Sequence, residues 1–290
     1  MLNSCKFREL IMKPNYYRPI ILVLFLIAII RPLQAFEGYS PIGARSAAMG
    51  YASVSLTDFW SIQNNPAGMA DYKHFAAGIA YQNRYLMQAL ALKSAAVIAP
   101  TKLGVLGVSF NQFGYNLYSE SKIGLAYARS FGKVLRLGLQ LDYLSTHIAE
   151  GYENANAITF EFGAQSQIND KLTAGAYIFN PIKARLSSYT DERIPVVLRF
   201  GLSYLFTPEL LGTAEIEKNF DNTASIRGGL EYFVLQKFYV RAGLVTNPNM
   251  LSFGAGYDIG PASIDIAAGV HQVLGSTIQA SLIFNFGMLK

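Results

Sequence analysis

Alternation of side-chain character with a period of two constrains this chain more than any other feature. From Phe75 to the C-terminus, apolar residues occupy every second position in long segments, with small or polar residues between them. Successive side chains of a strand point to opposite faces, so each segment predicts a strand with one apolar and one polar face. The pattern is clearest at Leu135–Tyr143, Ile158–Gln165, Leu198–Phe206 and Ile278–Phe286.

Fourteen such segments can be counted, an even number, as single-chain bacterial barrels have. Because strand boundaries are uncertain by a few residues, about 12 or 16 strands remain alternatives. The expected strands are 75–83, 86–99, 103–113, 121–131, 134–148, 155–167, 172–180, 194–206, 210–219, 223–234, 237–246, 249–258, 262–271 and 276–286. Tight turns alternate with longer loops, of which Pro181–Arg193 is the longest. Short periplasmic turns and longer external loops are typical of outer-membrane barrels.

Composition decides between a soluble and a membrane barrel. Charged residues make up only 15% of the chain, below the roughly 25% of a soluble domain. No apolar run beyond residue 31 approaches the ~20 residues of a spanning helix. A barrel of this many strands cannot fill its interior with side chains alone, which excludes a soluble barrel with an apolar core. The prediction is an all-β, transmembrane antiparallel β-barrel, spanning residues 74–290, in the outer membrane of a Gram-negative bacterium.

Residues 1–35 resemble a secretory signal peptide. Basic residues precede the apolar stretch Pro19–Ile30, and small residues follow it up to Ala35, where we expect cleavage. An uncleaved anchor is the weaker alternative, because this stretch is too short to span a bilayer. Met12 is an alternative start. Removal of this segment takes away most of the formal net charge of +5 and the single cysteine, so neither nucleic-acid binding nor thiol chemistry is expected.

Residues 36–73 do not alternate. Alanine-rich stretches with helical character are interrupted there by glycine and by an Asn-Pro pair, which predicts a compact helical insert ahead of the barrel. A periplasmic tail is the alternative. The residues that we expect to form this hatch or plug are Gly43, Arg45, Met49, Gly50, Asn65, Pro66, Ala67 and Gly68.

These motifs resemble the FadL superfamily of outer-membrane barrels, and within it the smaller PorV/PorQ-like branch. The matching pieces are 43–45, 48–50 with 52–54, and 65–68, in fixed order. The resemblance implies that the N-terminal segment folds into the lumen as a hatch. It also implies one of two functions, passage of hydrophobic molecules such as fatty acids or a partner role in type IX protein secretion. The short outer loops depart from the fatty-acid transporters, which use long loops to capture ligand.

The polar face of the predicted strands carries an acidic and basic network. Its members are Arg136, Asp142, Glu161, Arg199, Glu215, Glu217, Arg227, Glu231, Arg241 and Asp265. We interpret it as a salt-bridge ladder inside a plugged barrel, and a polar lining for a solute path is the alternative. Acids and bases are nearly balanced, which favours no ion strongly.

No cofactor, metal or enzymatic motif occurs, since His74, His147 and His271 lie far apart and no nucleophile elbow or phosphate loop is present. The sequence therefore predicts a non-enzymatic barrel that serves as a partner subunit of an export or assembly machine. A channel for hydrophobic small molecules is the alternative. Expected partners are outer-membrane lipid, another outer-membrane or exported protein, and in the alternative a hydrophobic ligand.

Overall fold

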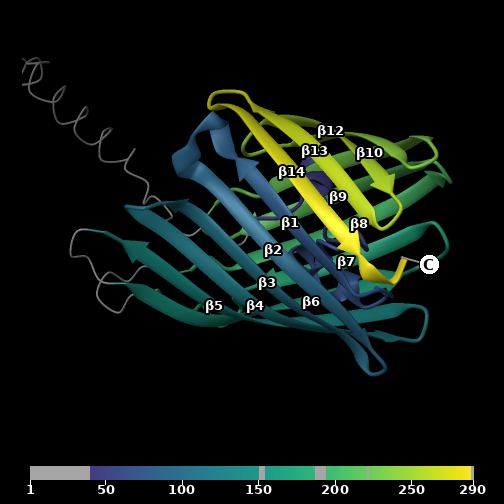
Figure 1. Ribbon diagram of the computed structural model, residues 1–290, viewed down its shortest axis with the longest axis horizontal. Coiled ribbons are helices and arrows are strands. Elements are labelled where there is room, and N and C mark those ends of the chain that lie inside the picture. Colours follow the sequence, from purple (N-terminus) through teal and green to yellow (C-terminus); the bar gives the residue numbers. More distant parts are fainter. Residues whose placement is uncertain (1–39, 150–153, 187–193, 221, 289–290) are drawn as a thin grey trace, which may run out of the picture. The chain divides into compact units, whose positions relative to one another are not determined.

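A closed antiparallel barrel forms the body of the protein. The computed structural model describes residues 40–149, 154–186, 194–220 and 222–288. The ring closes because the first strand pairs with both the second and the last (Figure 1). The strands are β1 (Ala76–Asn83), β2 (Ala91–Thr101), β3 (Gly104–Tyr115), β4 (Tyr118–Phe131), β5 (Leu135–Ile148), β6 (Ala155–Gln167), β7 (Leu172–Phe179), β8 (Val197–Thr207), β9 (Leu210–Asn219), β10 (Ser225–Leu235), β11 (Phe238–Val245), β12 (Met250–Ile259), β13 (Ala262–His271) and β14 (Gly275–Asn285). The prediction of fourteen antiparallel strands is confirmed.

One predicted strand begins later than the alternation suggested. Residues 86–90 were expected to open the second strand, but η2 (Arg84–Leu86) and η3 (Gln88–Leu90) lie there instead. Tyr85 and Leu86 have φ values of 54° and 58°, in the left-handed region, which reverses the chain and prevents strand pairing. The apolar character of Leu86 and Met87 therefore marks an exposed loop.

The two ends of the barrel differ in their connections. At the turn end, consecutive strands are joined by two to four residues, as between β2 and β3 or between β12 and β13. The loop end carries the longer connections, including residues 84–90 and 180–196. Part of the predicted loop Pro181–Arg193, and the predicted signal peptide 1–35, lie outside the described residues. The short helix η4 (Phe286–Met288) follows β14 at the turn end.

The outward face of the barrel is apolar. Leu139, Phe162, Phe200, Ile226 and Ile264 alternate with buried residues and expose between 41% and 58% of their surface. Such a continuous apolar band is stable against lipid rather than water. Among the described residues, no helix is long and apolar enough to cross a membrane.

The inward face is not uniformly polar, contrary to the simple alternation. Along β1 to β4 it carries buried apolar residues, including Ala76, Ile98, Val105 and Ala126. Along β5 to β13 it carries charged and amide side chains, interrupted by a second apolar cluster of Leu144, Tyr177, Phe179 and Val197. The inner wall thus has an apolar side at β1 to β4 and a mixed side, which carries most of the charges, beyond it.

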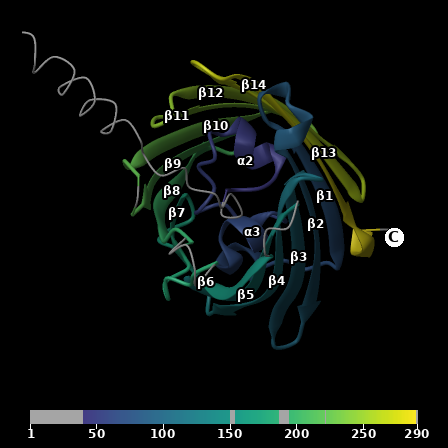
Figure 2. The same cartoon turned by 90° about the vertical axis from the view of Figure 1, so that its left-hand side faces the viewer.

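Residues 40–72, here called the inner segment, lie within the ring of strands, as Figure 2 shows. The segment contains α2 (Ala44–Ala48), α3 (Ser61–Asn64) and η1 (Pro66–Met69). Helix α2 contacts β11 to β14, whereas α3 contacts β3 and η1 contacts β4 to β6. Most of its residues are buried, so the segment occupies the inside of the barrel between opposite walls.

Candidate functional site

A turn centred on Asn65 fixes one part of the inner segment to the wall. Asn65 has φ −165° and ψ 102°, the extended conformation favoured before proline, and Pro66 starts η1. The Asn65 amide donates to Val54 O at 2.6 Å, and to the strand carbonyls of Ala164 and Ala176 at 3.4 and 3.3 Å. The inner segment is therefore hydrogen-bonded directly to the backbone of β6 and β7.

Glycines on the wall make room for this turn. Gly138 and Gly163 are cross-strand partners on β5 and β6. A Cβ at Gly163 would overlap Asn65 Oδ1, and a Cβ at Gly138 would overlap the backbone of Pro66 and Ala67. Gly68 lies in η1 and has no positive φ. Its missing side chain instead allows Leu56 O to approach within 2.6 Å of the Cβ position.

A second set of glycines receives Met49 and Gly50. Gly229 and Gly243 are cross-strand partners on β10 and β11, and a Cβ on either would overlap the backbone of residues 49 and 50. Ser252 of β12 completes the contact, because its hydroxyl donates to Ala48 O at 3.0 Å and accepts from Gly50 N at 3.1 Å. The motifs at 43–50 and 65–68 thus lie against two separate glycine-lined areas of the wall.

Arg45 joins the inner segment to the charged network. Its guanidinium binds Glu231 through two hydrogen bonds, of 2.7 and 2.9 Å, and Asp58 at 3.1 Å. Glu231 also accepts from Arg241 at 2.6 Å, and Arg241 binds Asp265 at 2.5 Å. Burial alone would lower the pKa of Arg45, but the carboxylates of Glu231 and Asp58 raise it above its ordinary value. The five side chains form one chain of alternating charge.

Glu215, Glu217 and Arg227 form a second group on β9 and β10. Arg227 binds Glu217 at 2.5 Å and Glu215 at 3.4 Å. The other oxygen of Glu215 accepts from the backbone N–H groups of Ser53 and Val54, both at 2.8 Å. Both groups of charges therefore contact the inner segment. Arg136 contacts it too, through Asp71 at 2.5 Å near the turn end.

Arg199 departs from the expected ladder. It stands opposite Glu217 in the β8–β9 register, yet none of its three guanidinium nitrogens has a hydrogen-bond partner among the described residues. Its guanidinium lies 4.0 Å from the centre of the Tyr177 ring, a cation–π contact. Arg199 does not bind Glu217 because its side chain points toward Tyr177 on β7 rather than along β9.

Asp142 and Glu161 are buried beside a residue that the sequence reasoning missed. Lys122 on β4 binds Glu161 at 2.6 Å, and Asp142 accepts from Gln140 at 2.8 Å. Lys122 falls inside the predicted strand 121–131, on the same face as Gly124 and Ala126, so the period of two alone would have placed this cation in the network. Tyr51 and Asp58 were also missed, since no periodicity marks residues of the inner segment.

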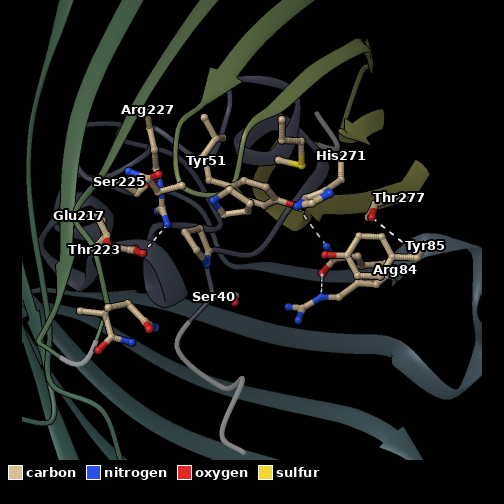
Figure 3. A pocket seen from close by; sticks show the side chains of 18 residues that line it. Ser40, Tyr51, Arg84, Tyr85, Glu217, Thr223, Ser225, Arg227, His271 and Thr277 are labelled. Carbon is tan, nitrogen blue, oxygen red and sulfur yellow. Dashed lines mark hydrogen bonds and ion pairs between the residues drawn. The ribbon is translucent and has the colours of Figure 1, made fainter. Parts of the chain in front are cut away.

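Two cavities lie on either side of the inner segment. The loop-end pocket, of about 270 Å³, is bounded by Pro41 and Tyr51 of the inner segment and by side chains of the barrel rim (Figure 3). The turn-end cavity, of about 780 Å³, is bounded by residues 70–73 and by the turns, with Arg136 and Gln167 in its wall. The arrangement is a lumen with a chamber at each end and folded chain between them. Among the described residues, no three His, Cys, Asp or Glu side chains are grouped so as to hold a metal.

Comparison with solved structures identifies the fold. The CymD monoaromatic hydrocarbon channel aligns with 87% of this chain and 99% of its own, with a TM-score of 0.66 and 14% identity. The TodX monoaromatic hydrocarbon channel deltaS2 mutant gives 0.69, at 13% identity over 86% and 100%. A Pseudomonas aeruginosa FadL homologue gives 0.61, at 14% identity over 83% and 98%. No known family profile and no curated protein matches the sequence.

These similarities show that the chain has the barrel fold of FadL-type outer-membrane channels. The neighbours are transport channels rather than enzymes. As a likeness of fold, they leave the predicted role as a secretion partner untested, and they lend no support to the PorV/PorQ-like branch.

Proposed function

We propose that this protein is an outer-membrane channel for hydrophobic small molecules, with the inner segment acting as a hatch. The observation that carries the proposal is the position of the inner segment between two cavities inside a closed barrel. Its FadL-type fold supports the same function, since the solved channels of this fold are named for monoaromatic hydrocarbons. A protein partner on the lipid-facing wall remains a prediction.

Passage requires that part of the hatch moves. The buried hydrogen bonds and ion pairs of the inner segment leave it packed against both walls, so the lumen is closed in this conformation. A solute that enters at the loop end first meets Pro41 and Tyr51. We expect release of residues near these positions to join the two cavities.

Conductance and uptake test the proposal together. Deletion of residues 40–70 should raise small-solute conductance in planar bilayers, because the folded chain between the cavities is removed. Cells that produce the intact protein should take up the uncharged dye N-phenyl-1-naphthylamine faster than cells with an empty vector. A deletion variant that stays at the closed conductance level would contradict the hatch, and unchanged dye uptake would contradict the channel.

Orientation is tested by labelling on intact cells. The longer connections are expected to face the exterior, as in other outer-membrane barrels. A cysteine at Val273, which is 83% exposed at the loop end, should react with a membrane-impermeant maleimide. A cysteine at Lys102, exposed at the turn end, should not react unless the cells are broken. The reverse result would invert the orientation.

A further inference from the structure

Four lysines lie together on one side of the turn end. Lys73 lies in the link from the inner segment to β1, and Lys102, Lys133 and Lys171 lie in the turns that follow β2, β4 and β6. These four residues, here called the basic arc, therefore occupy consecutive positions around the ring of strands. All four side chains are exposed.

Nearby acids do not neutralise the charge of the basic arc. In the part of the chain that the structure describes, none of the four ammonium groups forms an ion pair or a hydrogen bond. Asp71 lies near the arc but is already bound to Arg136 and to Ser130. Asp170, next to Lys171, is then a single carboxylate against four lysines. The field on this side of the turn end is therefore positive.

The opposite side of the turn end carries no such charge. There, within the described residues, the turn after β8 carries one acid, Glu209, the turn after β10 carries one base, Lys237, and the turn after β12 carries neither. Cations that anchor a barrel to lipid headgroups are useful on every side, because lipid surrounds the barrel. The one-sided arrangement therefore indicates a ligand that approaches from one direction, rather than the membrane.

The basic arc borders the turn-end cavity. Lys73 and Lys133 line this cavity of about 780 Å³, so their side chains lie on the lumen side of the barrel end. Val134 and Ile168 line it too, and they expose 56% and 57% of their surface between the lysines. A small anion would leave these apolar side chains uncovered, whereas a polypeptide can cover them while it pairs with the lysines.

The length of the basic arc suits an extended chain. From the start of β1 to the turn after β6, five to six strand spacings of about 4.8 Å, widened by the tilt of the strands, give about 25–35 Å along the ring. An extended polypeptide rises about 3.3 Å per residue, so about eight to eleven residues would reach all four lysines. A single small anion would reach only one or two of them.

We propose that the basic arc binds an acidic, extended segment of another polypeptide at the turn end of the barrel. Carboxylates of the segment pair with the four lysines, and its other side chains lie against Val134 and Ile168. With the turn end facing the periplasm, as expected for such a barrel, the partner is a periplasmic or exported protein. The inference does not depend on the channel function, because the four lysines make no contact that holds the hatch closed.

Fluorescence anisotropy with the purified full chain in detergent tests the proposal. The probe is a fluorescein-labelled peptide of about eleven residues in which glutamate alternates with serine, and its neutral counterpart has glutamine in place of glutamate. The acidic peptide should bind saturably and the neutral one should not, and binding should weaken as sodium chloride rises from about 0.05 M to about 0.5 M. Lys73→Gln/Lys133→Gln should weaken binding by about threefold or more, because each exposed ion pair contributes modestly. Replacement of all four lysines by glutamine should abolish saturable binding.

Lys218→Gln/Lys237→Gln is the matched control, because it removes the same charge at the loop end and on the opposite side of the turn end. This control should bind the acidic peptide like the parent, and circular dichroism shows whether each variant keeps its strand content. An equal loss in the control, or unchanged binding in the folded four-lysine variant, would overturn the proposal. Displacement of the peptide by phosphatidylglycerol in the micelles, or by free glutamate at the same carboxylate concentration, would assign the basic arc to headgroups or small anions and overturn it too. Peptide binding is measured without solute flux, so its failure and the failure of the channel function are separate results.

Discussion

The two halves of the inner segment are held by different physical interactions. The first half, residues 40–58, reaches the mixed side of the wall through Arg45 and through the Glu215 carboxylate. The second half, residues 59–72, packs Phe59, Ile62 and Met69 against the apolar side, and only the Asn65 amide anchors it to strand backbone. Buried ion pairs fail abruptly when one partner is lost, whereas apolar packing weakens by degrees.

This difference identifies the half that can be released. Charged contacts hold residues 40–58 together with the buried apolar residues Ile42 and Val54, and Tyr51 in that half already borders the loop-end pocket. The second half has one ion pair, between Asp71 and Arg136 near the turn end, and is otherwise held mainly by packed apolar atoms. We therefore expect hatch opening to involve the first half and to leave the second half in place.

The largest effect should follow loss of Glu231. Glu231→Ala leaves Arg45 and Arg241 near each other without their shared carboxylate, in a nearly solvent-free place. Removing one partner of a buried ion pair costs about 3–5 kcal/mol of unfolding free energy. Reversible unfolding in detergent measures this cost, and planar-bilayer conductance should rise. Glu209→Ala, at an exposed turn, should change the free energy of unfolding by less than about 0.5 kcal/mol. If the two variants lose the same free energy of unfolding, the ion pairs of Glu231 do not hold the first half, and the distinction between the halves is wrong.

Packing in the second half should respond in proportion to the atoms removed. Ile62 is completely buried, so Ile62→Ala should cost about 2–5 kcal/mol of unfolding free energy, and Ile62→Val about 0.5–1.5 kcal/mol. Conductance should stay at the closed level in Ile62→Val, because the first half remains bound. An open channel in that variant would show that the second half also controls the lumen.

The close approach of Asn65 to Gly163 predicts a smaller loss of stability when this glycine is replaced. Gly163→Ala places a Cβ against Asn65 Oδ1, and such overpacking typically costs about 1–3 kcal/mol of stability. Gly228→Ala on β10 is the control, because its added Cβ would meet no atom closer than 3.7 Å. Thermal unfolding in detergent should separate the two variants, and equal melting temperatures would mean that the turn does not need this glycine.

Alkaline pH should have almost no effect on the first half. The pKa of Arg45 is raised in the folded protein, so its ion pairs contribute stability below the unfolded pKa and lose it only above the folded one. Since arginine remains protonated up to about pH 12, conductance at about pH 11 should equal that at neutral pH. If the channel opens at such a pH while the protein keeps its strand content, a group other than Arg45 holds the first half in place.

Periodicity predicted the barrel because two-residue alternation is a local property of each strand. It wrongly placed residues 86–90 in a strand, because the left-handed conformations of Tyr85 and Leu86 turn the chain there despite the apolar pattern. The ten charged residues expected on the inward face are all buried there or nearly so, but their pairing was not accessible from sequence. Pairing depends on side-chain direction across strands, and for this reason Arg199 contacts Tyr177 instead of Glu217.

The inner segment was harder to interpret. Its motifs marked residues that lie against the wall, such as Asn65 and Gly50, but nothing in one sequence shows which wall glycine faces which motif. Tyr51 escaped notice for the same reason, since its hydroxyl is held by amides on β1 and β14 that are far away in sequence.

Trp60 makes release of the first half visible in optical experiments. It is the only tryptophan of the chain, it is almost fully buried, and its ring meets Phe59 edge-on at 5.0 Å between centroids. Although Trp60 belongs to the second half, its indole lies against Gly43 of the first half, so close that a Cβ at Gly43 would overlap Trp60 Cδ1. A hatch that opens through its first half would therefore change the surroundings of the indole. A spectroscopist can follow gating in this protein by intrinsic fluorescence and near-ultraviolet circular dichroism, without an attached probe.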